Sequence, residues 1–226
     1  MGKSKELATL TDVGGTIDGA LTITETSNQA LNLTTTGLGS QVVYQSSTTN
    51  TPWYTGVAGN AADDFLIYQG ATANAGDIYM YTNSYERMRI DASGRVTMPY
   101  QPMFSAYDAI GATASYITFA NTRRNIGNHF NASTGTFTAP IAGSYLFCWN
   151  GLHNNSYTTH ARVLFAVNNS ASVSWGDTLQ SVAGSFTETG LSQIIYLAAN
   201  DTVRLYNEAN AVYGPQYAAF TGILVG

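Results

Sequence analysis

The sequence has few charged residues, a single cysteine and no long apolar run. Charged side chains make up 10% of its 226 residues, against a usual figure of about 25%, and the net charge is −5. A monomer with so few charges would be poorly protected from association, so part of its surface is expected to be buried in an obligate oligomer. Both lysines, Lys3 and Lys5, lie at the start of the chain.

These shortages exclude several classes of protein. Apart from Arg123-Arg124 there is no basic cluster to neutralise phosphates, so no nucleic-acid partner is expected. No span approaches the roughly 18 apolar residues of a membrane helix, and the N-terminus lacks the apolar core of a signal peptide. The single Cys148 forms no disulfide within the chain and is expected to be a small buried group. The protein is therefore expected to be made in a cytosol, to stay soluble and to insert into no membrane.

Signatures of catalysis and of metal binding are also missing. His129, His153 and His160 have no zinc spacing, and the chain has no nucleophile elbow, Walker loop or dinucleotide fingerprint. We predict no enzymatic activity and no cofactor. Calcium stays open, because the carboxylates of Asp63-Asp64 and Asp77 are ligands of the right type, as does a metal on a threefold axis that gathers three copies of one histidine.

The clearest structural signal is an aromatic run in the second half of the chain. From Gly143 onward every second residue is aromatic, namely Tyr145, Phe147 and Trp149, and this period of two predicts a β-strand with its large side chains on one face. Pro140 and Gly143 interrupt the pattern just upstream. Two strands are therefore expected to meet at a short corner.

Two further blocks follow this strand, at residues 197–205 and 220–225. Together with Phe137 and the aromatic run they resemble the C1q globular head, in the superfamily shared with tumour necrosis factor, over roughly residues 102–226. The resemblance implies a ten-stranded jelly roll that packs as a tight trimer and presents loops for binding, without catalysis. Some such heads bind calcium, and the acids available here are Asp177, Glu188, Asp201 and Glu208. The residues expected to divide between the core and the threefold interface are Phe137, Tyr145, Phe147, Trp149 and Phe220.

The first 100 residues have the pattern of short strands. Small apolar groups recur about every 8 to 13 residues, separated by Gly, Asn, Ser or Asp, as in an all-β region or a β-solenoid. Strands are expected near residues 21–23, 31–33, 42–44, 53–57, 65–68, 78–81, 88–90 and 96–98. Before them, Leu7, Leu10 and Val13 mark a helical segment too short to be stable alone.

Residues 86–99 form the most distinctive part of this half. They read Glu-Arg-Met-Arg-Ile-Asp-Ala-Ser-Gly-Arg-Val-Thr-Met-Pro, two alternating strands around a turn in which Gly94 suits the left-handed position. Arg87, Arg89 and Arg95 are then expected near Asp91. With the opening of the chain, this segment resembles the N-terminal part of fibre proteins from tailed bacteriophages, including those of marine cyanobacteria, over residues 1 to about 102.

The two resemblances together predict a homotrimeric, all-β virion fibre. Residues 1–15 would anchor it to another virion protein, residues 16–101 would form a β-rich stalk, and residues 102–226 the head, with Pro99 and Pro102 stiffening the connector. A thin stalk has too little core per chain to offset about 1–2 kcal/mol of backbone ordering per residue, so three chains must share a buried face. Such a protein is made in the bacterial host cytoplasm and ends on the virion surface.

Polar loops of the head are the predicted contacts with a host surface glycan or protein. Tyr, Trp, Asn and His stack on and hydrogen-bond to such partners at little entropic cost. The candidates are His153, Asn154, Tyr157, His160, Trp175, Tyr213 and Tyr217. Two other functions stay open, a structural capsid or tail decoration without receptor binding, and a polysaccharide depolymerase that uses paired carboxylates.

Overall fold

The computed structural model describes residues 41–44, 53–57, 65–69, 76–154, 160–181, 186–213 and 215–226. The chain divides into two compact units, Met1–Asp77 and Ile78–Gly226. In the first unit, one antiparallel sheet has the order β1-β2-β3. Its strands are β1 (Gln41–Tyr44), β2 (Trp53–Val57) and β3 (Phe65–Gln69). They match the strands expected there, whereas Leu7, Leu10, Val13 and the strands expected near residues 21–23 and 31–33 lie outside the described residues.

The second unit begins with a small antiparallel sheet in the order β4-β5-β6. Its strands are β4 (Ile78–Thr82), β5 (Tyr85–Ile90) and β6 (Val96–Thr97). The division between the units therefore falls before this sheet, and the predicted stalk-to-head boundary at residues 101–102 lies inside the second unit.

The turn between β5 and β6 is the expected hairpin. Gly94 has a φ of 78°, a conformation that costs glycine little, and its amide donates to the Asp91 carbonyl over 2.8 Å. The Asp91 carboxylate accepts from the amides of Ser93 and Arg95 and pairs with Arg95 Nε at 2.7 Å. The hydrogen bond from the Arg95 amide is the largest cause that lowers the pKa of Asp91. Arg87 instead lies over the ring of Tyr100, at 4.7 Å.

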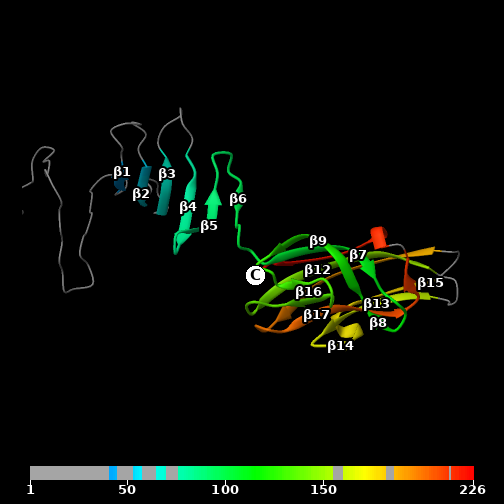
Figure 1. Cartoon of the computed structure of the whole chain (residues 1–226). Coiled ribbons are helices and arrows are strands. Elements are labelled where there is room, and N and C mark those ends of the chain that lie inside the picture. The colour runs from blue at the N-terminus through cyan, green and yellow to red at the C-terminus, as the bar shows by residue number, and fades with distance from the viewer. Residues whose placement is uncertain are drawn as a thin grey trace, which may run out of the picture. The chain divides into compact units, whose positions relative to one another are not determined.

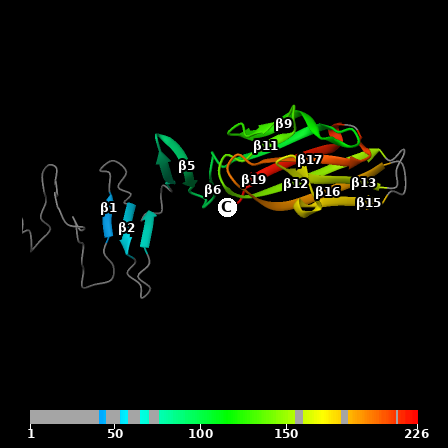
Figure 2. The same cartoon turned by 90° about the horizontal axis from the view of Figure 1, so that it is seen from below.

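The head is made of two antiparallel sheets, seen as two layers in Figures 1 and 2. The first sheet has the order β16-β12-β19-β7-β9, and β18 also pairs with β12. Its strands are β7 (Met103–Ile110), β9 (Thr118–Ile126), β12 (Gly143–Asn154), β16 (Phe186–Leu197), β18 (Ala211–Val212) and β19 (Ala218–Leu224).

The second sheet has the order β10-β11-β17-β13-β14, with β15 beside β13 and β8 beside β17. Its strands are β8 (Ser115–Tyr116), β10 (Phe130–Asn131), β11 (Thr136–Thr138), β13 (His160–Val167), β14 (Ser170–Ala171), β15 (Asp177–Ser181) and β17 (Thr202–Ala209). Two 3-10 turns, η2 (Val173–Trp175) and η3 (Pro215–Tyr217), complete the head. The all-β jelly roll is confirmed, and the described residues of the head form thirteen strands where ten were expected, four of them (β8, β10, β14 and β18) only two residues long.

The core lies between the two sheets because large apolar side chains alternate along the strands. On β12 the odd-numbered residues are buried, including Tyr145, Phe147 and Trp149. The predicted corner separates β11 from β12, and the Tyr145 hydroxyl donates to the Ile141 carbonyl within it, at 2.9 Å. On the neighbouring β19, a Cβ at Gly222 would lie 2.4 Å from a ring carbon of Phe104, so this position has no room for a side chain.

The chain enters and leaves the head at the same end. The Leu224 amide donates to the Pro102 carbonyl at 3.0 Å, and Gln101 Nε2 donates to the Leu224 carbonyl at 2.8 Å. Figures 1 and 2 show the C-terminus there and place η3, drawn in red, at the opposite end of the head. The segments around η3 therefore lie away from the connector.

Candidate functional site

The outward face of the first sheet carries an apolar row with one side chain from each of five strands. Cross-strand pairing aligns, in order from β16 to β9, Ile194, Leu146, Ile223, Met103 and Ile126. On β12, β16 and β19 these positions alternate with buried core residues, so their side chains point away from the core. Ile194 is 59% exposed. The outward face of the first sheet therefore carries apolar side chains that lie outside the core of the head.

The apolar row is flanked by further hydrophobic surface. Tyr196, two residues after Ile194 on β16, is 69% exposed. A hollow of about 190 Å³ beside the row is lined by Met103, Leu146 and Ile223 together with Cys148. Cys148 is half-buried on this outward face, so the expectation of a buried cysteine is wrong. The reason is strand parity, because even-numbered residues of β12 point away from the core.

The five aromatic residues expected to divide between the core and a threefold interface all lie in the core of one chain. Each is at most 2% exposed, and the set is Phe137, Tyr145, Phe147, Trp149 and Phe220. The apolar row consists of different residues. An interface between copies of the head through this row would therefore be made by apolar side chains on the outward face of the first sheet.

The predicted receptor-binding residues are not all on loops. His153 and Asn154 end β12, and His160 begins β13. His153 is fully buried, which makes its prediction as a surface contact wrong. Trp175 is partly buried and packs against the core from η2. Tyr157 lies outside the described residues.

Tyr213 and Tyr217 do come together on the surface. They are 39% and 52% exposed, and their rings stack at a centroid distance of 6.3 Å. Phe186, at the start of β16, is 48% exposed and lies 4.4 Å from the Tyr213 ring. We call Phe186, Tyr213 and Tyr217 the aromatic cluster. Three neighbouring exposed rings form a surface suited to stacking on a sugar or to packing against a partner.

A cavity of about 430 Å³ adjoins the aromatic cluster through Tyr217. It opens on the outward face of the first sheet and contains one acid, Glu188, and one base, Arg123. The Arg123 guanidinium lies 4.4 Å from the ring centre of Tyr107. A mixed polar and aromatic lining of this kind is suited to hydrogen bonding and stacking.

Buried His153 belongs to a polar network inside the head. Its Nε2 lies 3.0 Å from Thr189 Oγ1, and its Nδ1 lies 3.3 Å from the carbonyl oxygen of Asn210. A carbonyl only accepts, so the network assigns the proton of a neutral ring to Nδ1. Thr189 Oγ1 also accepts from Trp149 Nε1 at 3.0 Å. Burial lowers the pKa of His153 below its ordinary value, although the contact with Asn210 opposes this.

The lowered pKa of His153 predicts a loss of stability in mild acid. The unfolded chain takes up a proton as the pH falls through the ordinary histidine pKa of about 6.5, whereas the folded chain takes it up only at lower pH. The stabilisation is therefore present above about pH 6.5 and is lost as the pH falls toward the lowered folded pKa. Denaturant unfolding at pH 8 and pH 5 should show a larger loss for the wild type than for His153→Gln. Equal losses would contradict the prediction.

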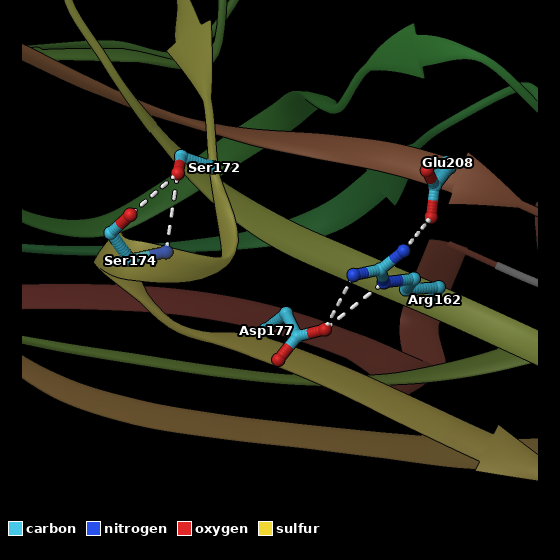
Figure 3. Close-up of polar contacts among 5 residues, drawn as sticks. All are labelled: Arg162, Ser172, Ser174, Asp177 and Glu208. Carbon is cyan, nitrogen blue, oxygen red and sulfur yellow. Dashed lines mark hydrogen bonds and ion pairs between the residues drawn. The ribbon is translucent and has the colours of Figure 1, made fainter.

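Two of the acids considered for calcium are held by Arg162 on the second sheet, as Figure 3 shows. Arg162 Nη2 lies 2.9 Å from Asp177 Oδ2, and Nη1 lies 2.8 Å from Glu208 Oε2. The hydrogen bond to Asp177 is the main cause that raises the pKa of Arg162. The Ser172 hydroxyl in the same view accepts from the Ser174 amide and shapes η2.

A third acid, Asp201, accepts from Asn168 Nδ2 and from the Ala198 amide, each at 2.8 Å. These hydrogen bonds, that of Asn168 first, lower the pKa of Asp201. Across the part of the chain that the structure describes, no three His, Cys, Asp or Glu side chains are grouped closely enough to hold a metal. Asp63 and Asp64 lie outside that part. A search of the same ranges for a helix with the length and hydrophobicity of a membrane span gives none.

Two antiparallel sheets around one aromatic core define a jelly-roll head. The chain belongs to the C1q domain family, whose model matches residues 103–225. This confirms the resemblance of the C-terminal half. No curated protein sequence matches the chain.

Several solved structures are similar to the head. The globular domain of zebrafish complement 1qA protein is 17% identical, with a TM-score of 0.46 over 56% of this chain and 98% of that one. Murine APRIL at pH 5.0 is 8% identical, with a TM-score of 0.43 over 55% and 99%. Eiger TNF from S. frugiperda is 12% identical, with a TM-score of 0.41 over 56% and 94%.

The residues of the apolar row were missed by the sequence reasoning, although the sequence contains a signal for them. Residues 145–149 are an unbroken apolar run, and Ile194 and Ile195 are adjacent. A strand with one solvent-exposed face alternates polar and apolar residues. A continuous apolar run therefore indicates that both faces of the strand become covered. Phe186 had no such signal, because an isolated aromatic residue at a strand end is common.

Proposed function

We propose that the protein is a homotrimer assembled through the apolar row of its C1q domain. The single observation that carries this proposal is the row itself, a ladder of five side chains across five strands that faces away from the core, with Ile194 59% exposed. Burying a large apolar side chain contributes about 1.5–3 kcal/mol, so repeating the row in three copies provides a substantial driving force. The resemblance to C1q heads supports three copies rather than two.

The solution mass of the full chain tests the assembly. One chain has a mass of 24.1 kDa, so a stable species of three times this value is expected at micromolar concentration. Multi-angle light scattering on purified protein gives the mass without a shape assumption. A single-chain or two-chain species would overturn the proposal.

We further propose that the aromatic cluster mediates attachment to a host cell surface, to a glycan or a protein. Phe186, Tyr213 and Tyr217 are exposed near η3, at the end of the head away from the connector. A head held by its N-terminal side would present this end outward. Binding rather than catalysis is favoured because the adjoining cavity holds only one carboxylate, Glu188, whereas glycoside cleavage uses two.

The proposed setting is the surface of a tailed-bacteriophage virion, as a tail or head fibre. Its support is the resemblance of residues 1–102 to phage fibre proteins, centred on the Asp91–Gly94 hairpin. In this proposal the N-terminal segment with Leu7, Leu10 and Val13 meets another virion protein, and residues 16–101 form the stalk. Locating residues 1–15 in images of an assembled particle tests the setting directly. A decoration protein without a receptor remains the second candidate.

Replacing Tyr217 by alanine should weaken attachment. The substitution removes one ring of the aromatic cluster, and aromatic contacts at interface centres commonly contribute 2 kcal/mol or more, so cell binding is expected to fall about tenfold or more. Tyr81→Ala is a matched control, since Tyr81 is 57% exposed on β4, outside the cluster. Binding of fluorescent protein to host cells measures both variants. Equal binding by the two variants would contradict the aromatic cluster as the contact, whereas no binding by either variant or by the wild type would favour the decoration protein.

A further inference from the structure

A larger polar groove, of about 660 Å³, lies on the outward face of the second sheet and the turns beside it. Its volume falls within the range of about 300–1,000 Å³ that is usual for ligand sites. Every lining residue is polar and none is an acid, although the protein as a whole carries a net charge of −5. The lining residues are Thr118, Asn128, His129, Asn131, Ser133, Thr134, Thr136, Thr138, Asn169, Thr202 and Arg204.

Arg204 is the one guanidinium that lines this groove, and none of the ion pairs found among the described residues includes it. It lies 3.8 Å from the ring centre of Tyr116, donates to the Thr134 carbonyl at 2.7 Å and approaches Asn169 Oδ1 at 3.4 Å. Its Nε is buried without a hydrogen-bond partner. Within the described ranges, no carboxylate lies within ion-pair distance of Arg204, whereas Arg162 on the same sheet binds two.

A partly buried cation without a counter-ion is costly. Burial lowers the pKa of Arg204, which shows that the surroundings disfavour its charge. An anion bound in the groove would supply the missing counter-charge through a charge-assisted hydrogen bond. The guanidinium is already fixed over Tyr116 by a cation–π contact, so little side-chain entropy is lost on binding.

The rest of the groove presents hydroxyl and amide groups from strands and from the turns between them. Thr138 pairs with Thr202 across β11 and β17, and Thr134 Oγ1 lies 2.9 Å from Thr136 Oγ1. Ser133 Oγ donates to Asn131 Oδ1 at 2.8 Å. Fixed hydroxyls and amides match the many hydroxyls of a sugar, whereas a lipid or an apolar peptide would need hydrophobic side chains that the lining lacks.

We propose that this groove binds an acidic polysaccharide, with a carboxylate or sulfate group of the saccharide against Arg204. The proposal names a ligand class for the attachment function above and rests on it. The groove faces away from the apolar row, so assembly through the row leaves it open in every copy. Three grooves per trimer would bind one long polymer with higher avidity than a single groove.

Retention of the purified full-length protein on immobilised polysaccharides tests the ligand class. Alginate supplies carboxylates, dextran sulfate supplies sulfate esters, and dextran is the neutral reference. Binding to at least one acidic polymer and none to dextran is expected, and the difference between the two acidic polymers identifies the anionic group. Poly-glutamate separates a saccharide from an acidic peptide, and binding to it as tight as to the best polysaccharide would overturn the proposal.

Two variants locate the binding in the groove. Arg204→Met keeps the aliphatic stem and removes the charge, so affinity for the acidic polymer should fall about tenfold to a hundredfold. Thr138→Val removes one hydroxyl at nearly constant shape and should weaken binding without affecting folding. Arg95→Met removes the same charge from the β5–β6 hairpin, where Arg95 is 77% exposed, and should bind as the wild type does.

The results separate this proposal from the attachment function. If the protein binds host cells but none of the acidic polymers, the groove is not the binding site, and the proposed attachment function is still supported. If the protein binds alginate or dextran sulfate through Arg204 but binds no host cell, the groove is supported as a polysaccharide site and the proposed attachment function is contradicted. Unchanged binding by both Arg204→Met and Thr138→Val would overturn the groove assignment.

Discussion

Replacing Ile194 by aspartate is expected to convert the assembled protein into single chains. Ile194 is 59% exposed in one chain, so a charge at this position is solvated and the fold of the head is kept. In the trimer the same position would be buried against a neighbouring copy. Each copy would then lose about 1.5–3 kcal/mol of apolar burial and also face the cost of burying a carboxylate. Light scattering at micromolar concentration should show one-chain mass.

Ile141→Asp is the matched control for this experiment. Ile141 is 51% exposed at the corner between β11 and β12, and its side chain is not part of the apolar row. The same change in charge there should leave the mass of the assembly unaltered. Circular dichroism of both variants should show the β-rich spectrum of the wild type. A variant Ile194→Asp that stays fully assembled would contradict the proposed interface.

Replacing Phe220 by alanine is expected to cause the largest loss of stability. Phe220 is fully buried on β19, and its ring lies between 4.9 and 6.2 Å from five others. These rings belong to Phe104, Phe119, Phe130, Phe147 and Phe165. They come from both sheets, so the cavity left by the substitution cannot close by a small local shift. Such a change costs about 3–5 kcal/mol, a large part of the stability of a typical domain.

Phe186→Ala is the control for Phe220→Ala, because it makes the same change of phenylalanine to alanine at an exposed position. Phe186 is 48% exposed, so its removal leaves no internal cavity and should cost far less. Denaturant unfolding at one fixed protein concentration measures both, because the stability of an oligomer depends on concentration. Similar losses for the two substitutions would show that the aromatic core does not control the stability of the head.

The strands and the hairpin could be predicted because their signals are local. The alternation at Tyr145, Phe147 and Trp149 predicted β12, and Gly94 predicted the turn between β5 and β6, as found. The C1q fold followed from three blocks whose order and spacing are specific. The homotrimer, the stalk and the virion setting stay predictions, since they concern partner molecules and a segment of which only part is described.

Residue roles were harder to predict because they depend on which face of a strand meets the core. His153 has the polar neighbours of a loop residue, yet β12 continues through it and turns its ring inward. Cys148 lies between two buried aromatics in sequence, yet strand parity points it outward. Tyr213 and Tyr217 were expected on the surface, but their stacking with Phe186 required segments distant in the sequence to meet.

The sequence by itself determined that this protein is built of strands, that its C-terminal half is a C1q-type jelly roll, and which stretch of the chain supplies aromatic residues to the core. Side-chain periodicity and turn residues are encoded over a few neighbouring positions, so they can be read directly. Only the tertiary structure decided which surfaces form, because the apolar row collects one residue from each of five strands and the acid-free groove collects residues from several strands and turns. Their composition depends on strand order and register, and these are set by packing across the whole head.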